Sequence, residues 1–337
     1  MDNQPVKKRS TAGFWICIIL LIIALGVSMF LNLGMGVALL ATTPTGTSSD
    51  TPVDQFPELE EEWSYGTGDV KVVRMALTGF ITRETEAGLF EAPIDRIEEL
   101  IHMIRAARND EEVMAIILEV DSPGGGITPS DEVYIELMRF KESAEGRKVV
   151  VLMRDLAASG GYYVAMAGDW LIAQPTTIVG SIGVIMQSLN WKVLSDKIGV
   201  TDTTIKSGDN KDMLNPFRES NPEEIALLQK MIDAMHDRFR GIVATSRGID
   251  PAALDNIADG RIFTSDEALA LKLIDQIGYW DDTVAKTAEV LGVDDIKVVR
   301  YYQTYSFWDF FVGIKHPLSS PLARLNKGPS FQYLWKP

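Results

Sequence analysis

The chain is poor in the residues that bind metals and form disulfides. Its 337 residues include one cysteine, Cys17, and three histidines, His102, His236 and His316. A single cysteine cannot form a disulfide within the chain, and the scattered histidines lack the spacing of a metal motif. Cys17 lies in an apolar N-terminal segment, so the soluble part has no cysteine nucleophile. We therefore expect no metal site and no cofactor.

Basic residues are also in the minority. Lys and Arg number 32, against 47 Asp and Glu, which gives a formal net charge of −15. Phosphate binding needs a basic surface, so this balance argues against nucleic acid as a partner. The simplest interpretation of the acidity is that it keeps the protein soluble.

Charge is absent altogether from a long N-terminal stretch. No residue between positions 9 and 50 is charged, and an apolar run that begins at Phe14 is long enough to cross a bilayer as one helix. Basic residues precede it at 7–9 and the next follows only at Lys71, so the positive-inside rule places the N-terminus in the cytoplasm. A cleaved signal peptide is the alternative, but its apolar core spans only about 7–15 residues, and residues 41–43 form a weak cleavage site. The prediction is an uncleaved membrane anchor.

Composition divides the chain into five segments. Residues 1–13 form a cytoplasmic N-terminus, and residues 14–41 form the transmembrane anchor. We interpret residues 42–68 as a linker, because they begin with Thr, Ser, Pro and Gly and continue into an acidic run. Residues 69–295 form the folded domain, and residues 296–337 form an aromatic-rich C-terminal extension. The extension could contact a neighbouring subunit or the membrane, or simply dock on the domain.

Apolar runs alternate with helical patterns throughout the folded domain. The strand candidates are residues 70–77, 113–120, 149–153 and 170–173. Between them, apolar residues recur at helical spacing in 94–104 and 133–138, and a third helix begins at Ser159. Near-continuous apolar strands separated by amphipathic helices indicate an α/β fold, with a parallel sheet covered by helices on both faces. Such a sheet places its functional loops at the carboxyl ends of its strands.

Two glycine-containing loops follow strands in this pattern. One has the sequence DSPGGG at 121–126, and the other has RDLAASGGYY at 154–163. Ser159 lies in the second, where strand becomes helix, so it is a candidate for either a helix N-cap or a nucleophile. Consecutive glycines let backbone N–H groups face an anion, and acyl transfer needs such donors where the oxyanion develops. The pair of loops favours the nucleophile, with the N–H of Gly160 as a second oxyanion donor.

A serine nucleophile needs a general base. None of the three histidines suits this role, because two lie within helical patterns and the third lies in the tail. A lysine can serve where burial favours its neutral form. Lys206 and Lys211 flank a polar loop at 207–210. Reasoning from these residues leaves the choice between the two lysines open.

Five motifs follow one another between residues 121 and 264: DSPGGG, DLAASGGYYVA, VGSIGV, SGDNKDMLNPF and DGRIFT. Together they resemble signal peptide peptidase A, a family of membrane-bound bacterial serine peptidases in peptidase family S49. The resemblance covers Val70 to Gly278 and the N-terminal anchor, and it implies a fold similar to that of the Clp protease and crotonase families. It also implies a Ser–Lys dyad in residues 69–295, with Ser159 as nucleophile and Lys211 as general base.

The same resemblance assigns further roles. Gly125 and Gly160 match the backbone positions that hold the oxyanion, and Ser181 matches a serine that helps to orient the lysine amine. The chain is similar to the short, single-copy form of the family, whose subunits assemble into a dome-like ring and build substrate grooves between neighbours. The implied task is degradation of remnant signal peptides and other apolar peptides at the extracytoplasmic face of the bacterial inner membrane. The aromatic tail from Tyr301 is longer than a minimal core needs.

Two other functions are compatible with such a fold. A crotonase-like protein could bind an acyl thioester through its glycine loop, but no basic cluster for phosphates is evident, and an extracytoplasmic domain would not meet coenzyme A. The other alternative is a catalytically inactive, membrane-anchored assembly or scaffold protein. The presence of both dyad residues argues against it.

Overall fold

A computed structural model describes residues 12–41, 52, 54–57, 59–83, 95–302 and 331–334. The chain divides into two units, one up to Pro52 and one from Val53 onward. The first contains helix α1, Ala12–Ala41, whose segment Trp15–Met35 is long and apolar enough to cross a membrane, by length and composition. The apolar run therefore forms a single helix, as its sequence predicts.

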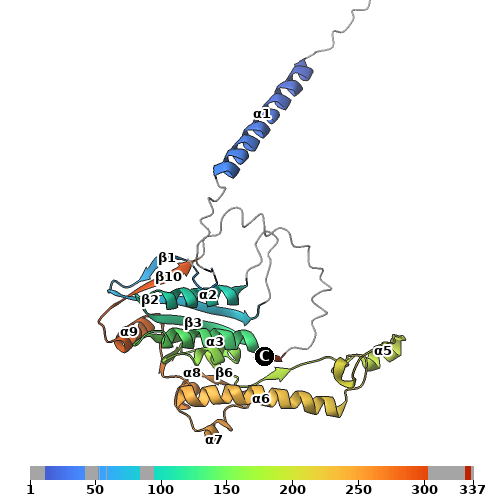
Figure 1. The fold of residues 1–337 in the computed structure, drawn as a ribbon, viewed down its shortest axis with the longest axis vertical. Coiled ribbons are helices and arrows are strands. Elements are labelled where there is room, and N and C mark those ends of the chain that lie inside the picture. The colour runs from blue at the N-terminus through green and yellow to red at the C-terminus, as the bar shows by residue number, and fades with distance from the viewer. Residues whose placement is uncertain are drawn as a thin grey trace, which may run out of the picture. The chain divides into compact units, whose positions relative to one another are not determined.

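A mostly parallel sheet forms the centre of the second unit (Figure 1). Its main path runs in the order β1-β10-β2-β3-β4-β5-β9, and every pair on this path is parallel except β1 with β10. These strands are β1 Glu60–Tyr65, β2 Val70–Ile81, β3 Val113–Gly126, β4 Lys148–Ala158, β5 Trp170–Ala173, β9 Gln276–Ile277 and β10 Ile296–Tyr302. Four short strands extend the sheet: β6 Ile178–Gly180, β7 Ile185–Met186, β8 Ile262–Thr264 and β11 Phe331–Leu334. The sheet thus begins inside the predicted linker, with β1, and includes β10 from the predicted C-terminal extension.

Helices cover both faces of this sheet. They are α2 Arg96–Asn109, α3 Ile127–Glu142, α4 Gly160–Ala165, α5 Lys192–Ile198, the 3-10 helix η1 Asp209–Asp212, α6 Pro222–Arg247, α7 Pro251–Leu254, α8 Ser265–Ala270 and α9 Trp280–Leu291. Side chains of α2, α3, α4 and α6 share one apolar core with Val73 of β2, whereas α9 shares another with Val72. Alternate residues of a strand face opposite sides, so both faces of the sheet are buried and its strands are continuously apolar. The predicted α/β class is confirmed.

The glycine-rich stretch is part of a strand and not a loop. β3 continues beyond the predicted end at residue 120, and Gly124 and Gly125 pair with Phe80 and Ile81 of β2. A Cβ atom at Gly125 would lie only 2.2 Å from the carbonyl oxygen of Ile81. The two strands can therefore approach this closely only because a glycine stands there.

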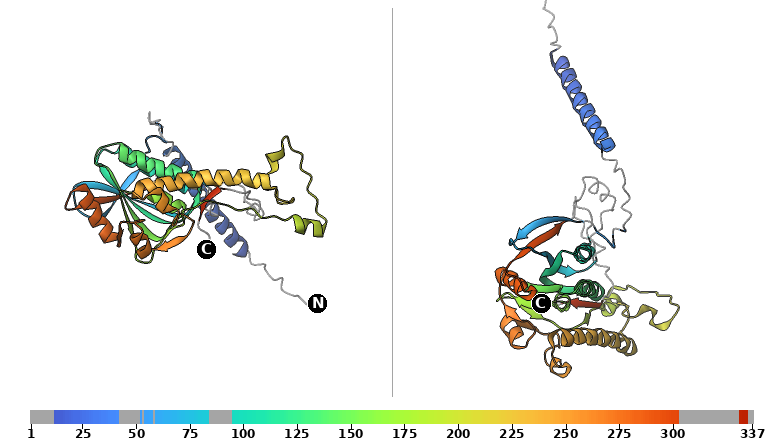
Figure 2. Two further views of the ribbon diagram at one scale, coloured as in Figure 1. Left: turned by 90° about the horizontal axis from the view of Figure 1, so that it is seen from below. Right: turned by 60° about the vertical axis from the view of Figure 1, so that its left-hand side comes forward.

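The segment between β7 and α6 extends away from the sheet (Figures 1 and 2). We call residues 187–221, which carry α5 and η1, the arm. Several of its apolar side chains face solvent, with Ile198 65% and Ile205 97% exposed. Exposed apolar surface of this kind is typical of an interface with another molecule.

Candidate active site

Ser159 stands where β4 ends and α4 begins, in a strained backbone conformation. Its φ is 54° and its ψ is −117°, which costs a residue with a side chain about 1–3 kcal/mol. Its N–H donates to the carbonyl of Gly180 at 2.7 Å, and its own carbonyl accepts from the N–H of Tyr163 at 2.8 Å. A strained serine on a strand-to-helix turn has the geometry of a nucleophile elbow.

The side chain of Ser159 does not cap the helix. No side-chain cap bond forms at the start of α4, and the Ser159 Oγ is buried with no hydrogen-bond partner among the described residues. Leaving a buried hydroxyl without a partner costs about 1–3 kcal/mol, so such a group calls for an explanation other than stability. The capping interpretation therefore loses its physical basis.

Gly125 and Gly160 lie side by side at this turn. A Cβ atom at Gly160 would lie 3.2 Å from the backbone nitrogen of Gly125 and 2.6 Å from the Oγ of Ser130. Gly160 is also the first residue of α4, where backbone N–H groups have no partner within the helix. The two candidate oxyanion donors thus come from adjacent segments of β3 and α4.

Two buried serines that the sequence analysis did not single out shape the glycine-rich stretch. The Ser122 Oγ donates to the carbonyl of Gly79 at 2.6 Å and accepts from the N–H of Gly124 at 3.0 Å. The Ser130 Oγ donates to the carbonyl of Gly126 at 2.8 Å. Serine commonly forms such a bond to the backbone two residues on, so the spacing of Ser122 and Gly124 in the sequence could have indicated this role for Ser122.

Ser181 lies one residue beyond Gly180, whose carbonyl holds the backbone of Ser159. Ser181 is buried, its φ is 51°, and its N–H donates to the carbonyl of Arg261 at 2.7 Å. Because β6 pairs with the end of β4, the structure brings the segment of Ser181 beside Ser159.

The two candidate lysines lie on the arm and differ in their partners. The Lys206 Nζ lies 2.7 Å from the Asp212 carboxylate and 2.9 Å from the carbonyl oxygen of Asp209. Hydrogen bonds from Arg218, and then from Lys206, hold the pKa of Asp212 well below its usual range. The Lys211 side chain is exposed, and its amine forms no hydrogen bond or ion pair with any described residue. Of the two lysines, Lys211 is thus the one whose amine is not held by a carboxylate or carbonyl group of the described residues.

The structure does not bring Ser159 and Lys211 together within one chain. The Ser159 Oγ has no hydrogen-bond partner among the described residues, so it does not bond the Lys211 amine. Lys211 belongs to η1 on the arm, which extends away from the sheet in both views of Figure 2. The serine belongs instead to the buried core of the sheet.

The strand β11 lies against the glycine-rich stretch. It runs antiparallel to β3, with Tyr333 opposite Gly125, and on its other side it pairs with β7, with Phe331 opposite Met186. An extended segment of the chain thus fills a slot between β3 and β7, beside the candidate oxyanion donors. Pairing of a peptide with exposed strand edges is a general mode of peptide recognition.

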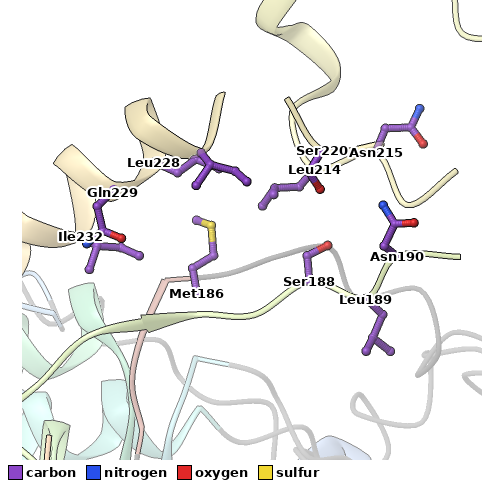
Figure 3. A pocket seen from close by; sticks show the side chains of 11 residues that line it. Met186, Ser188, Leu189, Asn190, Leu214, Asn215, Ser220, Leu228, Gln229 and Ile232 are labelled. Atoms are coloured by element: carbon purple, nitrogen blue, oxygen red, sulfur yellow. The ribbon is translucent and has the colours of Figure 1, made fainter. Parts of the chain in front are cut away.

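A pocket of about 240 Å³ opens next to this slot (Figure 3). Its lining comes from β7, the arm and the first half of α6, and includes Met186, Leu214, Leu228 and Ile232. Met186 also pairs with Phe331 of β11, so the pocket adjoins the slot. Polar side chains such as Ser188 and Asn190 complete the lining, so the pocket offers an apolar guest both packing surface and hydrogen-bond partners.

The chain matches known peptidases over most of its length. Residues 141–294 match peptidase family S49. The chain is 35% identical over 242 residues to "Putative signal peptide peptidase SppA" of Enterococcus faecium, covering 72% of this chain and 70% of that protein. It is 36% identical over 237 residues to "Putative protease slr0021" of Synechocystis sp., covering 70% and 80% of the two proteins. "Protease 4" of Salmonella typhi is 36% identical over 200 residues, which is 59% of this chain and 32% of that longer protein.

The fold and these matches define a peptidase of the α/β class. The chain belongs to the signal peptide peptidase A family, within peptidase family S49, with its Clp protease and crotonase-like fold. The family expected from the five sequence motifs is confirmed.

Proposed function

We propose that the chain is a membrane-anchored serine endopeptidase that degrades remnant signal peptides and other apolar peptides at the extracytoplasmic face of the bacterial inner membrane. Ser159 is the nucleophile and Lys211 is the general base. One observation carries the proposal: the Ser159 hydroxyl is buried without a partner among the described residues, on a strained turn beside the backbone of Gly125 and Gly160.

The reaction follows from the chemistry of these groups. Neutral Lys211 takes the proton of the Ser159 hydroxyl while the Oγ attacks the scissile carbonyl carbon. The N–H groups of Gly125 and Gly160 hold the oxyanion, and each such donor lowers the barrier by about 2.7–4 kcal/mol. The lysine then returns its proton to the leaving amine. Water, activated by the same amine, hydrolyses the acyl-enzyme, and Ser181 orients the amine throughout.

Lys211 reaches the serine of a neighbouring copy in this proposal. Within the described part of one chain the serine lacks a partner, and the lysine lies on the extended arm. The arm exposes apolar side chains such as Ile198 and Ile205, which association with a second copy would bury. Covering the amine in this way would also remove it from water and favour its neutral form. A ring of such contacts agrees with the homo-oligomer that the sequence resemblance implies.

The slot between β3 and β7 supports a peptide substrate in extended conformation. Main-chain bonds to these strands would place its carbonyl groups along Gly124–Gly126, and the adjoining pocket would take an apolar side chain. Because β11 runs from Phe331 near the pocket toward Gly124, the pocket serves residues on the N-terminal side of the scissile bond. Apolar peptides of the signal-peptide type match this lining, and α1 would hold the enzyme at the membrane where such peptides remain.

The test is hydrolysis of an apolar, signal-peptide-like fluorogenic peptide by the full chain in detergent. Ser159→Ala and Lys211→Ala should each abolish hydrolysis while the fold persists, whereas Lys197→Ala, an exposed lysine elsewhere on the arm, should leave it unchanged. A serine-directed phosphonate should label the parent and not Ser159→Ala. Full activity in Ser159→Ala would refute the nucleophile. A folded parent that neither cleaves nor becomes labelled would instead favour an inactive scaffold.

A further inference from the structure

The strand β4 reaches Ser159 through a large bulge. Its ladder with β3 passes directly from the pair of Val120 and Met153 to the pair of Ser122 and Ala157. One residue of β3 therefore opposes three residues of β4, numbers 154–156, which we call the β4 bulge. Before the bulge β4 pairs with β5, and from Leu156, the last residue of the bulge, it pairs with β6. Bulges bend a strand and redirect the residues beyond them. The proposed nucleophile, Ser159, follows this one after the two paired residues Ala157 and Ala158.

Two side chains of β3 hold the bulge from one side. Burial, and then the neighbouring Asp155, raise the pKa of the Asp121 carboxyl, while the backbone N–H of Leu156 beside it acts in the opposite direction. Glu119, only 3% exposed, forms an ion pair with the guanidinium of Arg154. Backbone groups at a bulge lose their ladder partners, so side chains that replace those partners decide its conformation.

Thr177 holds the bulge from the other side. Its hydroxyl lies 3.1 Å from the carbonyl oxygen of Met153 and also within hydrogen-bond distance of the carbonyl of Arg154. Thr177 is 1% exposed, and its own carbonyl accepts from the buried Ser265 hydroxyl at 3.2 Å. The Thr177 hydroxyl thus contacts β4 between the residues that pair with β5 and those that pair with β6.

We propose that Asp121 and Thr177 are positioning residues, which clamp the β4 bulge from both sides and so keep Ser159 in the strained conformation from which it attacks. The inference rests on the proposed function. Neither residue need touch the substrate, because both act through the backbone between the bulge and the serine. A strained conformation persists only where its surroundings enforce it. Displacement of a catalytic group by ~1 Å can lower turnover by about a hundredfold.

The first test replaces the clamp hydroxyl in the full chain. Thr177→Val removes the hydroxyl at nearly constant volume and should lower kcat at least about tenfold with KM unchanged, while Thr177→Ser should retain most of kcat. Labelling of Ser159 by a small serine-directed phosphonate should slow by a similar factor. Thr287→Val is the matched control, because the Thr287 hydroxyl is equally buried and donates to the carbonyl of Thr283 at 2.7 Å on α9. This control should keep the parental kcat.

The second test addresses the opposite side of the bulge, and it also decides the matter if Thr177→Val does not fold. Asp121→Asn keeps a carbonyl oxygen that can accept from Leu156, whereas Asp121→Ala does not, so kcat should fall much further in the alanine variant. Parental kcat in Thr177→Val, or equal kcat in the two Asp121 variants, would overturn the inference. Activity in Ser159→Ala would instead overturn the proposed function, so the two failures are distinguishable.

Discussion

Mixing two inactive variants is expected to restore activity, because the proposed site draws Ser159 and Lys211 from different copies of the chain. Ser159→Ala lacks the nucleophile but keeps an intact arm, and Lys211→Ala lacks the base but keeps an intact serine. In a mixed ring, a site is complete wherever a chain with Ser159 receives the arm of a chain with Lys211.

The size of the recovery is obtained by counting interfaces. In a cyclic assembly every contact is heterologous, and each site combines one residue from each of two neighbours. Random assembly of equal amounts leaves about a quarter of the sites complete, since each neighbour contributes the intact residue half of the time. If the fraction of one variant is f, activity should vary as f(1 − f). A dyad formed within one chain would give no recovery at any ratio.

The assay is the initial rate of hydrolysis of an apolar fluorogenic peptide, per total subunit, after co-expression of the two variants with different affinity tags. Sequential purification on both tags ensures that the assembly is mixed. Ser159→Ala co-expressed with the double variant Ser159→Ala/Lys211→Ala is the control, because no site in that mixture has a serine. Mixed assemblies that are no more active than this control would refute the contribution of Lys211 by a neighbour.

Three further results are expected. Gly125→Ala should abolish hydrolysis and lower the free energy of unfolding by about 1–3 kcal/mol, measured by denaturant unfolding, because its Cβ would lie 2.2 Å from the Ile81 carbonyl oxygen. Ending the chain before Phe331 should lower KM for short apolar peptides in steady-state kinetics, because β11 no longer competes for the slot. Asp212→Asn should lower kcat without changing the thermal unfolding midpoint, because it weakens the bonds from Arg218 that order η1.

The cluster around Asp212 also predicts a pH dependence. Arg218, and then Lys206, hold the pKa of Asp212 below its unfolded value. The bonds of this cluster, which order η1 locally, are therefore fully present above the unfolded pKa and are lost only as pH falls through the lowered pKa. Mild acid, down to about pH 4, should therefore leave η1 in place.

Parental kcat in Asp212→Asn, an unchanged KM after truncation, or an active Gly125→Ala would each contradict the corresponding argument.

The candidate site was only partly accessible to sequence reasoning. The small residues around Ser159 are compatible with both a nucleophile and an N-cap, and the second glycine-containing loop favours the nucleophile. The facts that exclude the cap, a backbone φ of 54° and a hydroxyl without a described partner, appear only in the structure. The position of Ser130 beside Gly160, the bonds of Thr177 to β4 and the pairing of Phe331 with Met186 could not be foreseen, since each depends on residues far apart in the chain.

The alternation of buried strands and amphipathic helices, the apolar N-terminal helix and the family can all be read from the sequence, because apolar periodicity and short motifs are local properties of the chain. Three features emerge only in the folded chain: DSPGGG is a strand, Gly125 and Gly160 lie side by side, and Lys211 lies on an arm apart from Ser159. These features arise from strand register and close backbone approach, which depend on the packing of the whole sheet.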